Sequence, residues 1–554
     1  MKPTEATLWL FLRKMRAPLI VLNLAHALPV VLLTLVPGVD GEGKPIYLSF
    51  FDAMYIVAYT ATTIGFGEIP YAFTYEQRAV VLMTIYLTVP AWVYAIGSII
   101  ALLQEKTFVN AVRMNAFRRK VRNLQEEFVV ICGYTDASRL LINRLNRDNR
   151  YRIVVIDKNP DKIEEVESEL YLPSIPAIAA DASATEVLKA AGIQSEKCRY
   201  IVTLFEESQL NLKISVRARV LNKNLRIIAR SGIKQSGENL STIGVDHVID
   251  VFSIMAKRID FALRSPYLFN LLSWVQGGNL HVSRTDNLPR GNYIVCGRGR
   301  IAHAVTGMLE KHAIAYTHID IMERIQEFSV SEYDFFLEAG VTEAACVIAA
   351  TNDDAINLSI IAAARAINPS IFTIVRENEL NERSLFSNLR ADKIFALDQI
   401  AALDGYNYIQ RPMTFRFIDE VEKLGEEGFA RILTTITETL NKRPPLIESV
   451  IDEERMYALF RYLQEGTVTL GQILNDPYRN GEDLELTVLG IAQEGGDFIL
   501  MPPDDVALNP GDRLLFAATN EGLKRFDVIV NHYYELYFVL HGQEASRIYL
   551  PWRR

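Results

Sequence analysis

The stretch Thr62-Thr63-Ile64-Gly65-Phe66-Gly67-Glu68 decides the fold of the N-terminal part of this chain. Its two glycines alternate with bulky residues, and glycine adopts backbone φ values that other residues resist. Successive carbonyl groups can therefore turn to the same side and form a ladder of oxygens. A ring of such ladders from several chains would replace the water shell of a bare cation, and the Thr63 hydroxyl would add one further layer of oxygens.

The segments around this stretch have the lengths expected of a membrane domain. Residues 17–36 and 79–103 are apolar and uncharged, and each is close to the roughly 20 residues that a helix needs to cross a bilayer. Residues 50–62 are apolar but too short to cross a hydrocarbon core of about 30 Å, so they fit a re-entrant helix. The alternative is two buried helices of a soluble domain joined by an ordinary turn. The order of the segments favours the membrane interpretation.

This order of spanning helix, half-helix, glycine stretch and spanning helix resembles the pore unit of two-helix potassium channels. Within the Thr-Val-Gly-Tyr-Gly filter signature of that family, the chain has Ile for Val and Phe for Tyr. The resemblance implies a pore domain over residues 17–103 in which Glu68 raises the cation concentration at the outer mouth. Phe66 lacks the phenol hydroxyl that would brace the filter from behind. The implied selectivity filter consists of Thr63, Ile64, Gly65, Phe66 and Gly67.

The second spanning segment contains two points where a helix can bend. Pro90 removes a backbone donor and is expected to kink the helix, and Gly97 is a second soft point. In the channels that this chain resembles, a glycine of the inner helix can act as the gating hinge, so Pro90 and Gly97 are candidates. Close packing between helices explains Gly97 equally well. Residues 104–126, which follow, contain neither Pro nor Gly and predict a charged helical linker.

Charge and length limit the compartment and the partners. With 554 residues the chain predicts three or four domains, and its net charge of −9 argues against nucleic acid as a partner. Basic residues precede the first span and follow the second at 113–122, so both termini are expected to be cytoplasmic, with the chain anchored in the bilayer of the inner (plasma) membrane. No cleavable signal peptide is expected. Residues 1–16 predict an interfacial helix on the inner leaflet, the alternative being a simple extension of the first span.

From residue 127 onward, apolar strands alternate with helices, and the pattern occurs twice. The strand and turn at 128–133 (FVVICG) are echoed at 293–297 (YIVCG), and 152–157 (RIVVID) is echoed at 315–320 (AYTHID). Such alternation predicts parallel sheets covered by helices on both faces. A tight turn after the first strand and an acidic residue ending the second are typical of a doubly wound, Rossmann-like dinucleotide-binding fold.

These two units resemble the RCK, or KTN (TrkA-type), domains that regulate potassium conductance. The resemblance implies a homotetramer with eight RCK units in a gating ring. It implies a first RCK domain at 127–280, in which residues 254–274 form the crossover helix, and a linker at 281–291. A second domain follows, with a Rossmann lobe and crossover helix at 292–420 and a small α+β, TrkA-C-like lobe at 421–554. Residues 425–478 are expected to contain helices and turns, and residues 484–519 short strands.

The second unit carries the better dinucleotide turn. Its glycines precede a helix start whose amides can hold a pyrophosphate, two arginines add positive charge, and an acidic residue follows 23 positions after the first glycine, where a ribose-binding acid belongs. A loop at the same sheet edge would contact the nucleotide or cap the next helix. The candidate residues are Gly297, Arg298, Gly299, Arg300, Ile301, Asp320, Thr351, Asn352 and Asp353.

The first unit carries a weaker version of the same site. It keeps Gly133 and the strand-end acid Asp157, but Thr135 replaces the second glycine, and Asp136 would repel a phosphate. Asp181 lies in a turn that resembles a Gly-Asp-Ala-Thr turn of the RCK family. Gly133, Asp157 and Asp181 are therefore the weaker candidates, for an adenosine-only or vestigial site.

Together these observations predict a non-enzymatic, ligand-gated potassium channel that NAD or an adenine nucleotide regulates. Calcium or another divalent cation is a further ligand that the resemblance allows, with no metal residues assigned. The alternatives are a membrane-anchored NAD-dependent oxidoreductase and a regulatory subunit of a potassium transporter. The first requires a positioned proton donor that the scattered histidines do not supply. The second would have RCK units but no filter of its own.

Overall fold

A computed structural model describes residues 3–545 except 233, 276–287, 321–331, 380–382, 441–443, 477–482, 494, 495 and 497. The chain forms two compact units. The first contains residues 1–124, and the second contains most of residues 125–554. We describe each unit by itself.

The N-terminal unit has the predicted order of long helix, short helix and long helix. Two helical segments, Arg13–Leu35 and Tyr75–Gln104, are long and apolar enough to cross a membrane. A small hairpin precedes the short helix. The elements are α1 (Pro3–Leu35), β1 (Gly38–Val39), β2 (Pro45–Ile46), α2 (Phe50–Ala61), α3 (Tyr75–Gln104) and α4 (Lys106–Arg122).

Two helix boundaries in this unit differ from the sequence-based expectation. The stretch expected to form a separate interfacial helix at residues 1–16 instead continues into the first span, because α1 is unbroken from Pro3 to Leu35. The expected linker helix is separated from the inner helix at Glu105, whose φ of −72° and ψ of 117° are extended. Glu105 also forms an ion pair with Lys14 of α1. The linker is therefore a distinct helix, α4.

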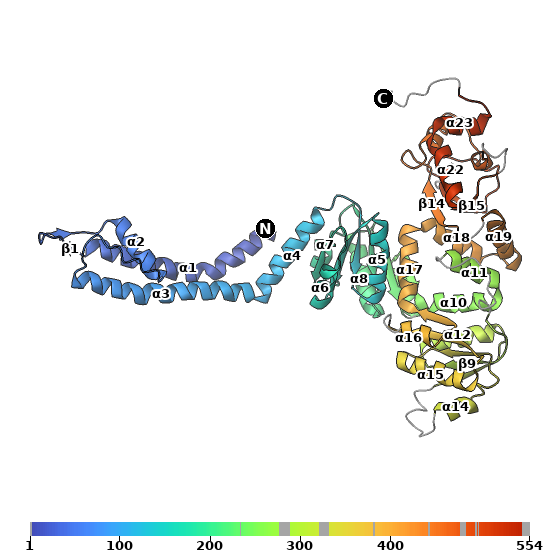
Figure 1. Ribbon diagram of the computed structural model, residues 1–554, viewed down its shortest axis with the longest axis horizontal. Coiled ribbons are helices and arrows are strands. Elements are labelled where there is room, and N and C mark those ends of the chain that lie inside the picture. The colour runs from blue at the N-terminus through green and yellow to red at the C-terminus, as the bar shows by residue number, and fades with distance from the viewer. Residues whose placement is uncertain are drawn as a thin grey trace. The chain divides into compact units, whose positions relative to one another are not determined.

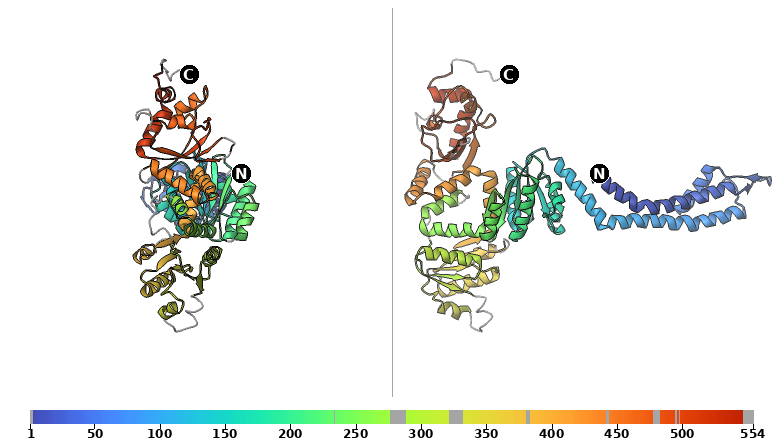
Figure 2. Two further views of the ribbon diagram at one scale, coloured as in Figure 1. Left: turned by 90° about the vertical axis from the view of Figure 1, so that its right-hand side faces the viewer. Right: turned by 180° about the vertical axis from the view of Figure 1, so that it is seen from behind.

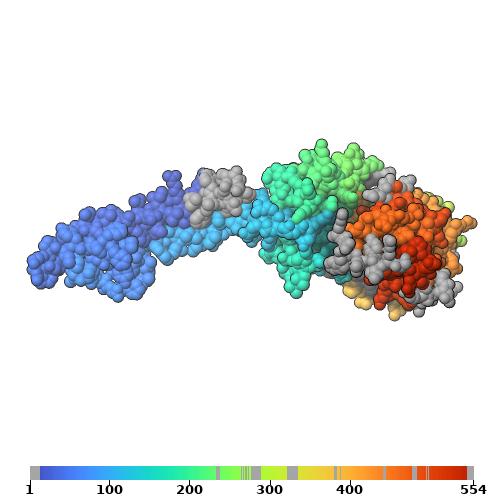
Figure 3. Space-filling view, turned by 90° about the horizontal axis from the view of Figure 1, so that it is seen from above, coloured from blue at the N-terminus to red at the C-terminus, as the bar shows by residue number. Residues whose placement is uncertain are grey.

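Helices α1 and α3 lie side by side (Figure 1), and Figure 3 shows the surface of this unit in blue. Val30 and Leu33 of α1 pack with Ile56, Val57 and other residues of α2 in a small core. Many large apolar side chains of the long helices remain exposed, such as Leu24 at 63% and Val93 at 63%. Exposed apolar surface of this extent is typical of helices that face lipid or other subunits.

The large unit begins with the first parallel sheet, of order β5-β4-β3-β6-β7-β8. Strand β3 is buried along its whole length, and β4 and β6 beside it are largely buried, which the near-continuous apolar runs predict. The strands are β3 (Phe128–Cys132), β4 (Arg152–Asp157), β5 (Ala177–Ala179), β6 (Cys198–Thr203), β7 (Arg226–Ser231) and β8 (His247–Asp250). The helices between them are α5 (Asp136–Asp148), α6 (Pro160–Ser168), α7 (Thr185–Ala190), α8 (Ser208–Leu221) and α9 (Lys234–Thr242).

The second parallel sheet repeats this arrangement, with the order β10-β9-β11-β12-β13 (Figure 1). In both sheets the strand that precedes the glycine turn pairs with the next strand of the chain on one side and with a later strand on the other, which agrees with the predicted repeat. The strands are β9 (Tyr293–Cys296), β10 (Tyr316–Ile319), β11 (Cys346–Ala349), β12 (Phe372–Glu377) and β13 (Lys393–Ala396). The helices are α12 (Arg300–Lys311), α14 (Glu332–Glu338), α15 (Asp354–Ile367) and α16 (Arg383–Asn388).

Helices after each sheet join the parts of the large unit. The expected single crossover helix at 254–274 is two helices, α10 (Val251–Arg264) and α11 (Pro266–Val275), because Pro266 starts a new helix after Ser265. They lie between the second parallel sheet and the C-terminal lobe (Figure 2). Trp274 of α11 and Phe417 share one core with strands of that lobe. The later helices are α17 (Leu397–Gln410), α18 (Pro412–Glu422) and α19 (Glu426–Thr439).

The C-terminal lobe is a small antiparallel sheet with helices, of order β14-β17-β15-β16. Strand β14 lies in a region expected to contain only helices and turns, where it pairs with β17. Its period-2 pattern is weak, because all five of its residues are partly buried. The elements are β14 (Leu446–Val450), α20 (Tyr457–Tyr462), α21 (Leu470–Leu474), β15 (Leu486–Ala492), β16 (Phe498–Leu500), β17 (Arg513–Ala518), α22 (Asn520–Asn531) and α23 (Tyr533–His541). The predicted fold class is confirmed.

Candidate pore and nucleotide sites

The glycine stretch after α2 has the alternating backbone that a carbonyl ladder needs. Thr63, Gly65 and Gly67 have φ values of 58°, 64° and 72°, whereas Ile64 and Phe66 between them do not have positive φ. A left-handed conformation at every second residue turns successive carbonyls to one side, and it is uncommon for a residue such as threonine. Residues 62–70 are all exposed in the single chain. The backbone of residues 63–67 therefore has the alternation that the predicted ladder of carbonyl oxygens requires.

The stretch is anchored to the end of α2. The backbone N–H groups of Ile64 and Gly65 both donate to the carbonyl of Tyr59, at 3.0 and 3.2 Å. The Tyr59 hydroxyl donates to the carbonyl of Glu68 at 3.3 Å, and the Tyr55 hydroxyl donates to the Glu68 carboxylate at 3.0 Å. Both ends of the stretch are thus held by residues of α2.

Phe66 packs between the same two tyrosines. Its ring stacks on Tyr55 at 6.4 Å between centroids and meets Tyr59 edge-on at 6.3 Å. The bracing hydroxyl that Phe66 lacks is therefore supplied from α2. Sequence analysis missed Tyr55 and Tyr59, although their spacing of four residues on one helix face next to the glycine stretch was a usable signal. Glu68, predicted at the outer mouth, has its carboxylate held by Tyr55.

We expect Tyr55→Phe to shorten the open events of the pore severalfold, because it removes the hydroxyl that holds Glu68 and keeps the ring that stacks on Phe66. Single-channel recording measures the open times directly. Tyr47→Phe is the matched control, because Tyr47 is 59% exposed and lies before α2. Equal open times in the two variants would contradict the bracing role.

The two hinge candidates lie inside α3, which continues through both without a break. A Cβ atom added at Gly97 would meet no heavy atom within 4 Å, so close packing within this chain does not require the glycine. Pro90 removes one hydrogen bond from the same helix. The hinge role of both residues stays a prediction.

The turn after β9 requires its first glycine. Gly297 has a φ of 125°, and a Cβ atom there would lie 2.8 Å from the carbonyl oxygen of Ala350. Gly299 is the N-cap of α12, so the unpaired backbone amides of the first turn of this helix point toward the glycine turn. A Cβ atom at Gly299 would lie 3.6 Å from the Asn352 side-chain oxygen. His318 contacts the Gly297 carbonyl at 2.6 Å.

The charged candidates of this turn are brought together only in part. Arg298 is 75% exposed and lies 3.4 Å from Asp320 at the end of β10, as the dinucleotide pattern predicts. Arg300 instead points its guanidinium over the ring of Phe252 in α10, 4.1 Å from the ring centroid. Desolvation lowers the pKa of Arg300. Ile301 is a buried core residue.

The loop after β11 lies at the same carboxyl edge of the second parallel sheet. Its side chains mainly form hydrogen bonds with the loop itself and with α15. The Asp353 side chain accepts the Ile356 N–H at 3.1 Å and caps α15, which is one of the two predicted roles. The Thr351 hydroxyl donates to Asn357 at 2.8 Å. Asn352 accepts a hydrogen bond from Arg376, whose burial lowers its pKa to about 10. Asn352 faces the glycine turn, because its side-chain oxygen is 3.6 Å from the Cβ position of Gly299.

The carboxyl edges of the two parallel sheets face each other within the large unit. Arg230 at the end of β7 forms a 2.7 Å ion pair with Asp398, which lies just after β13, and the two side chains are only 7% and 15% exposed. Burial raises the pKa of Asp398, while the charge of Arg230 lowers it. The contact of Arg300 with Phe252 joins the same two edges. The candidate nucleotide turn thus adjoins the contact between the first and the second parallel sheet of the large unit.

The equivalent turn in the first unit is filled by the chain's own groups. Gly133 has a φ of 91°, and a Cβ atom there would lie 2.6 Å from the ring of Phe205. The backbone N–H of Tyr134 donates to Asp157 at 2.6 Å. Asp181 accepts the Ser183 N–H at 2.8 Å, and hydrogen bonding to Ser183 lowers the pKa of Asp181. Thr351 holds the position of Phe205 in the second unit, because the backbone N–H of each donates to the equivalent asparagine, Asn211 or Asn357.

Comparison with known families agrees with this domain order. Residues 20–105 match the ion channel family, and residues 129–251 and 293–397 each match the TrkA-N domain. The chain therefore combines one ion-channel domain with two TrkA-N domains. The predicted resemblance to two-helix potassium channels with tandem RCK domains is confirmed.

Similar proteins have been found among archaea. An uncharacterized protein of Methanothermus fervidus is 28% identical over 247 residues, which cover 44% of this chain and 37% of that protein. Probable potassium channel protein 2 of Methanocaldococcus jannaschii is 26% identical over 242 residues, which cover 44% of this chain and 66% of that protein. The chain thus spans less than two thirds of these relatives. The solved GsuK channel is 17% identical, covers 94% of this chain and 99% of its own, and has a TM-score of 0.45.

Proposed function

We propose that this chain is the subunit of a potassium channel whose cytoplasmic units respond to a nucleotide bound at the Gly297–Gly299 turn. The observation that carries the proposal is the alternation of positive φ at residues 63, 65 and 67, placed after a short helix and between two helices able to span a membrane. Carbonyl ladders of this kind replace the hydration shell of potassium. The match of residues 20–105 to the ion channel family supports the same assignment.

The pore requires several copies of the chain. One chain supplies one ladder, and residues 62–70 are exposed on it, so a closed shell of oxygens needs ladders from neighbouring chains. We infer a homotetramer, which brings eight TrkA-N units together in a gating ring. The basic residues that flank the two spans support a cytoplasmic position for both termini.

The nucleotide acts through the contact between the two parallel units. Gly297 and Gly299 leave room for a pyrophosphate at the start of α12, Arg298 adds charge, and Asp320 supplies the acid for a ribose. Arg300, the first residue of the same helix, contacts Phe252 of the other unit. A ligand that binds the open and closed arrangements of this contact with different affinity shifts the pore equilibrium, whereas equal affinity shifts nothing.

The two rival functions lack a comparable observation. A regulatory subunit of a transporter would not need the alternating backbone at residues 63–67. For an NAD-dependent oxidoreductase, His318 and His303 are the imidazoles near the turn, and His318 is engaged with the Gly297 carbonyl. As for calcium, no group of three or more metal-binding side chains occurs among the residues that the structure describes.

The nucleotide assignment is tested with Gly299→Leu. The leucine side chain would fill the space beside Asn352, so we expect NAD or an adenine nucleotide to lose its effect on open probability, with the potassium reversal potential unchanged. Purified channel in planar bilayers, under a potassium-against-sodium gradient and with NAD on the cytoplasmic side, gives both values. Gly307→Leu is the control, because Gly307 lies exposed on α12 with no heavy atom within 4 Å of its Cβ position. A Gly299→Leu channel that still responds to NAD would refute this site.

A further inference from the structure

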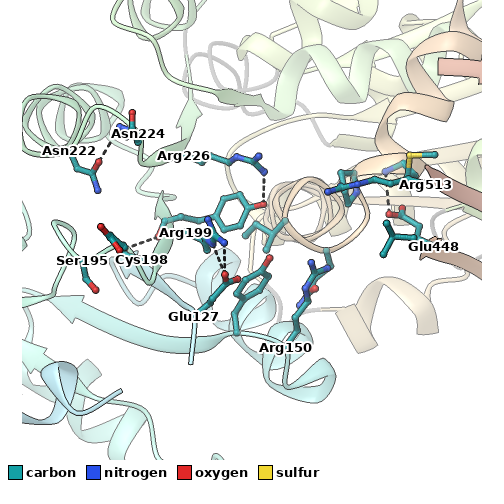
Figure 4. A pocket seen from close by; sticks show the side chains of 18 of the residues that line it. Glu127, Arg150, Ser195, Cys198, Arg199, Asn222, Asn224, Arg226, Glu448 and Arg513 are labelled. Atoms are coloured by element: carbon teal, nitrogen blue, oxygen red, sulfur yellow. Dashed lines mark hydrogen bonds and ion pairs between the residues drawn. The ribbon is translucent and has the colours of Figure 1, made fainter. Parts of the chain in front are cut away.

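A cavity lies in the large unit at the amino-terminal edge of the first parallel sheet, opposite the edge that carries the Gly133 turn. Its volume is about 590 Å³. One wall consists of residues that precede or begin β3, β4, β6 and β7, which is the amino-terminal edge of that sheet. The other wall consists of the α17–α18 connection, β14 and the first residue of β17. Figure 4 shows the labelled side chains of the two walls converging on one space.

The lining is rich in guanidinium groups. Five arginines line the cavity against three glutamates, so positive charge is in excess. Three of the arginines come from the first parallel unit and two from the C-terminal lobe. The arginines are Arg150, Arg199, Arg226, Arg455 and Arg513, and the glutamates are Glu127, Glu196 and Glu448.

Two of the glutamates are already committed to other partners. Glu127 forms an ion pair with Arg199. Glu448 accepts hydrogen bonds at the start of α18, from the Thr414 N–H at 2.8 Å, the Thr414 hydroxyl at 2.7 Å and the Met413 N–H at 3.2 Å. Glu448 keeps its charge, but its oxygens are turned toward these donors at the start of α18.

Two of the five arginines are held in place by neutral groups. Arg226 donates to the Tyr200 hydroxyl at 3.1 Å, and Arg150 lies over the Tyr151 ring at 5.1 Å. Across the part of the chain that the structure describes, Arg150, Arg226, Arg455 and Arg513 form no ion pair with a carboxylate. Their positive charge is available to a ligand.

We propose that this cavity binds a small anion with two or more negative charges, of the class of phosphorylated metabolites. The planar fork of arginine matches the oxygens of a phosphate and binds them in pairs. The volume lies within the range of about 300–1,000 Å³ typical of small-molecule sites. Because the arginines come from both walls, the bound anion would tie the first parallel unit to the C-terminal lobe. This site is separate from the Gly297–Gly299 turn, which relies on helix amides at the carboxyl edge of the second parallel sheet.

The proposal is tested by titrating the purified full-length protein with inorganic pyrophosphate in an isothermal titration calorimeter. We expect saturable binding that Arg150→Gln and Arg513→Gln, one from each wall, each weaken about tenfold, since one charge-assisted hydrogen bond corresponds to about that factor. Arg431→Gln, an exposed arginine of α19 outside the cavity, should bind like the wild type. Gly299→Leu should also keep this binding, which separates the cavity from the nucleotide turn.

Three results would overturn the proposal. They are no binding of pyrophosphate, binding that neither Arg150→Gln nor Arg513→Gln weakens, and binding that Gly299→Leu removes. Circular dichroism of each variant checks that it is folded, and both arginines are exposed, so their replacement is not expected to unfold the protein. If one variant is nevertheless misfolded, the other wall's variant decides alone.

Discussion

Gly67→Ala is expected to abolish potassium-selective current. Gly67 has a φ of 72°, and an L-residue in this region costs roughly 1–2 kcal/mol. No close clash adds to this, because the nearest atom to a Cβ there is the Gly65 carbonyl oxygen at 4.0 Å. The cost is therefore conformational, and under the proposed function it recurs in every chain of the ring. We expect alanine to relieve it by turning the carbonyl out of the ladder. The reversal potential under a potassium-against-sodium gradient measures the loss.

The matched control for this prediction is Gly43→Ala. Gly43 has a φ of 80° and open space around its Cβ position, so the backbone cost is similar. It lies between the strands of the small hairpin β1–β2, outside the filter. We expect this variant to conduct with unchanged selectivity. A Gly67→Ala channel with the same reversal potential as Gly43→Ala would remove the filter assignment.

Arg230→Met is expected to destabilise the large unit strongly. It leaves Asp398, whose side chain is 15% exposed, without its 2.7 Å partner. Removing one member of a buried ion pair costs about 3–5 kcal/mol, because a buried charge stays uncompensated. The large unit should therefore unfold at a lower temperature, and amides of β7 and the start of α17 should exchange faster. Thermal unfolding and hydrogen exchange of the full-length protein measure both effects.

A second substitution shows whether the unpaired charge is the cause. In Arg230→Met/Asp398→Leu the buried charge is gone, so we expect much of the lost stability to return. Arg139→Met is the control, because Arg139 is 52% exposed and its 3.5 Å pair with Glu169 is screened by solvent. If Arg230→Met destabilises the protein no more than Arg139→Met, the two sheet edges are not held together by this pair.

The same pair bears on gating. Arg230 with Asp398, and Arg300 with Phe252, join the two parallel units at the edge where the nucleotide turn lies. Under the proposed function, a ligand bound at this edge acts directly on the contact between the two parallel sheets. Arg230→Met should therefore alter the nucleotide dependence of open probability as well as stability.

The sequence alone determined the order of spans and re-entrant helix, the filter stretch and the two Rossmann-like units. These features depend on local properties of the chain. A helix must be long enough to cross a membrane, glycines permit positive φ at alternate residues, and a buried parallel strand is apolar throughout. Helix breaks were predicted less well. No Pro or Gly marks the extended backbone of Glu105. Pro266, in contrast, was a signal of a helix break, and the prediction of a single crossover helix did not use it.

Only the tertiary structure decided which side chains complete each site. Tyr55 and Tyr59 brace the filter, Phe205 fills the first glycine turn, and Arg300 turns from its expected phosphate role to Phe252. Each of these contacts except the first joins residues far apart in the chain, and side-chain direction there follows from packing of whole elements. A turn motif specifies the path of its own backbone. What occupies the space beside that backbone depends on the neighbouring strand, which no local pattern encodes.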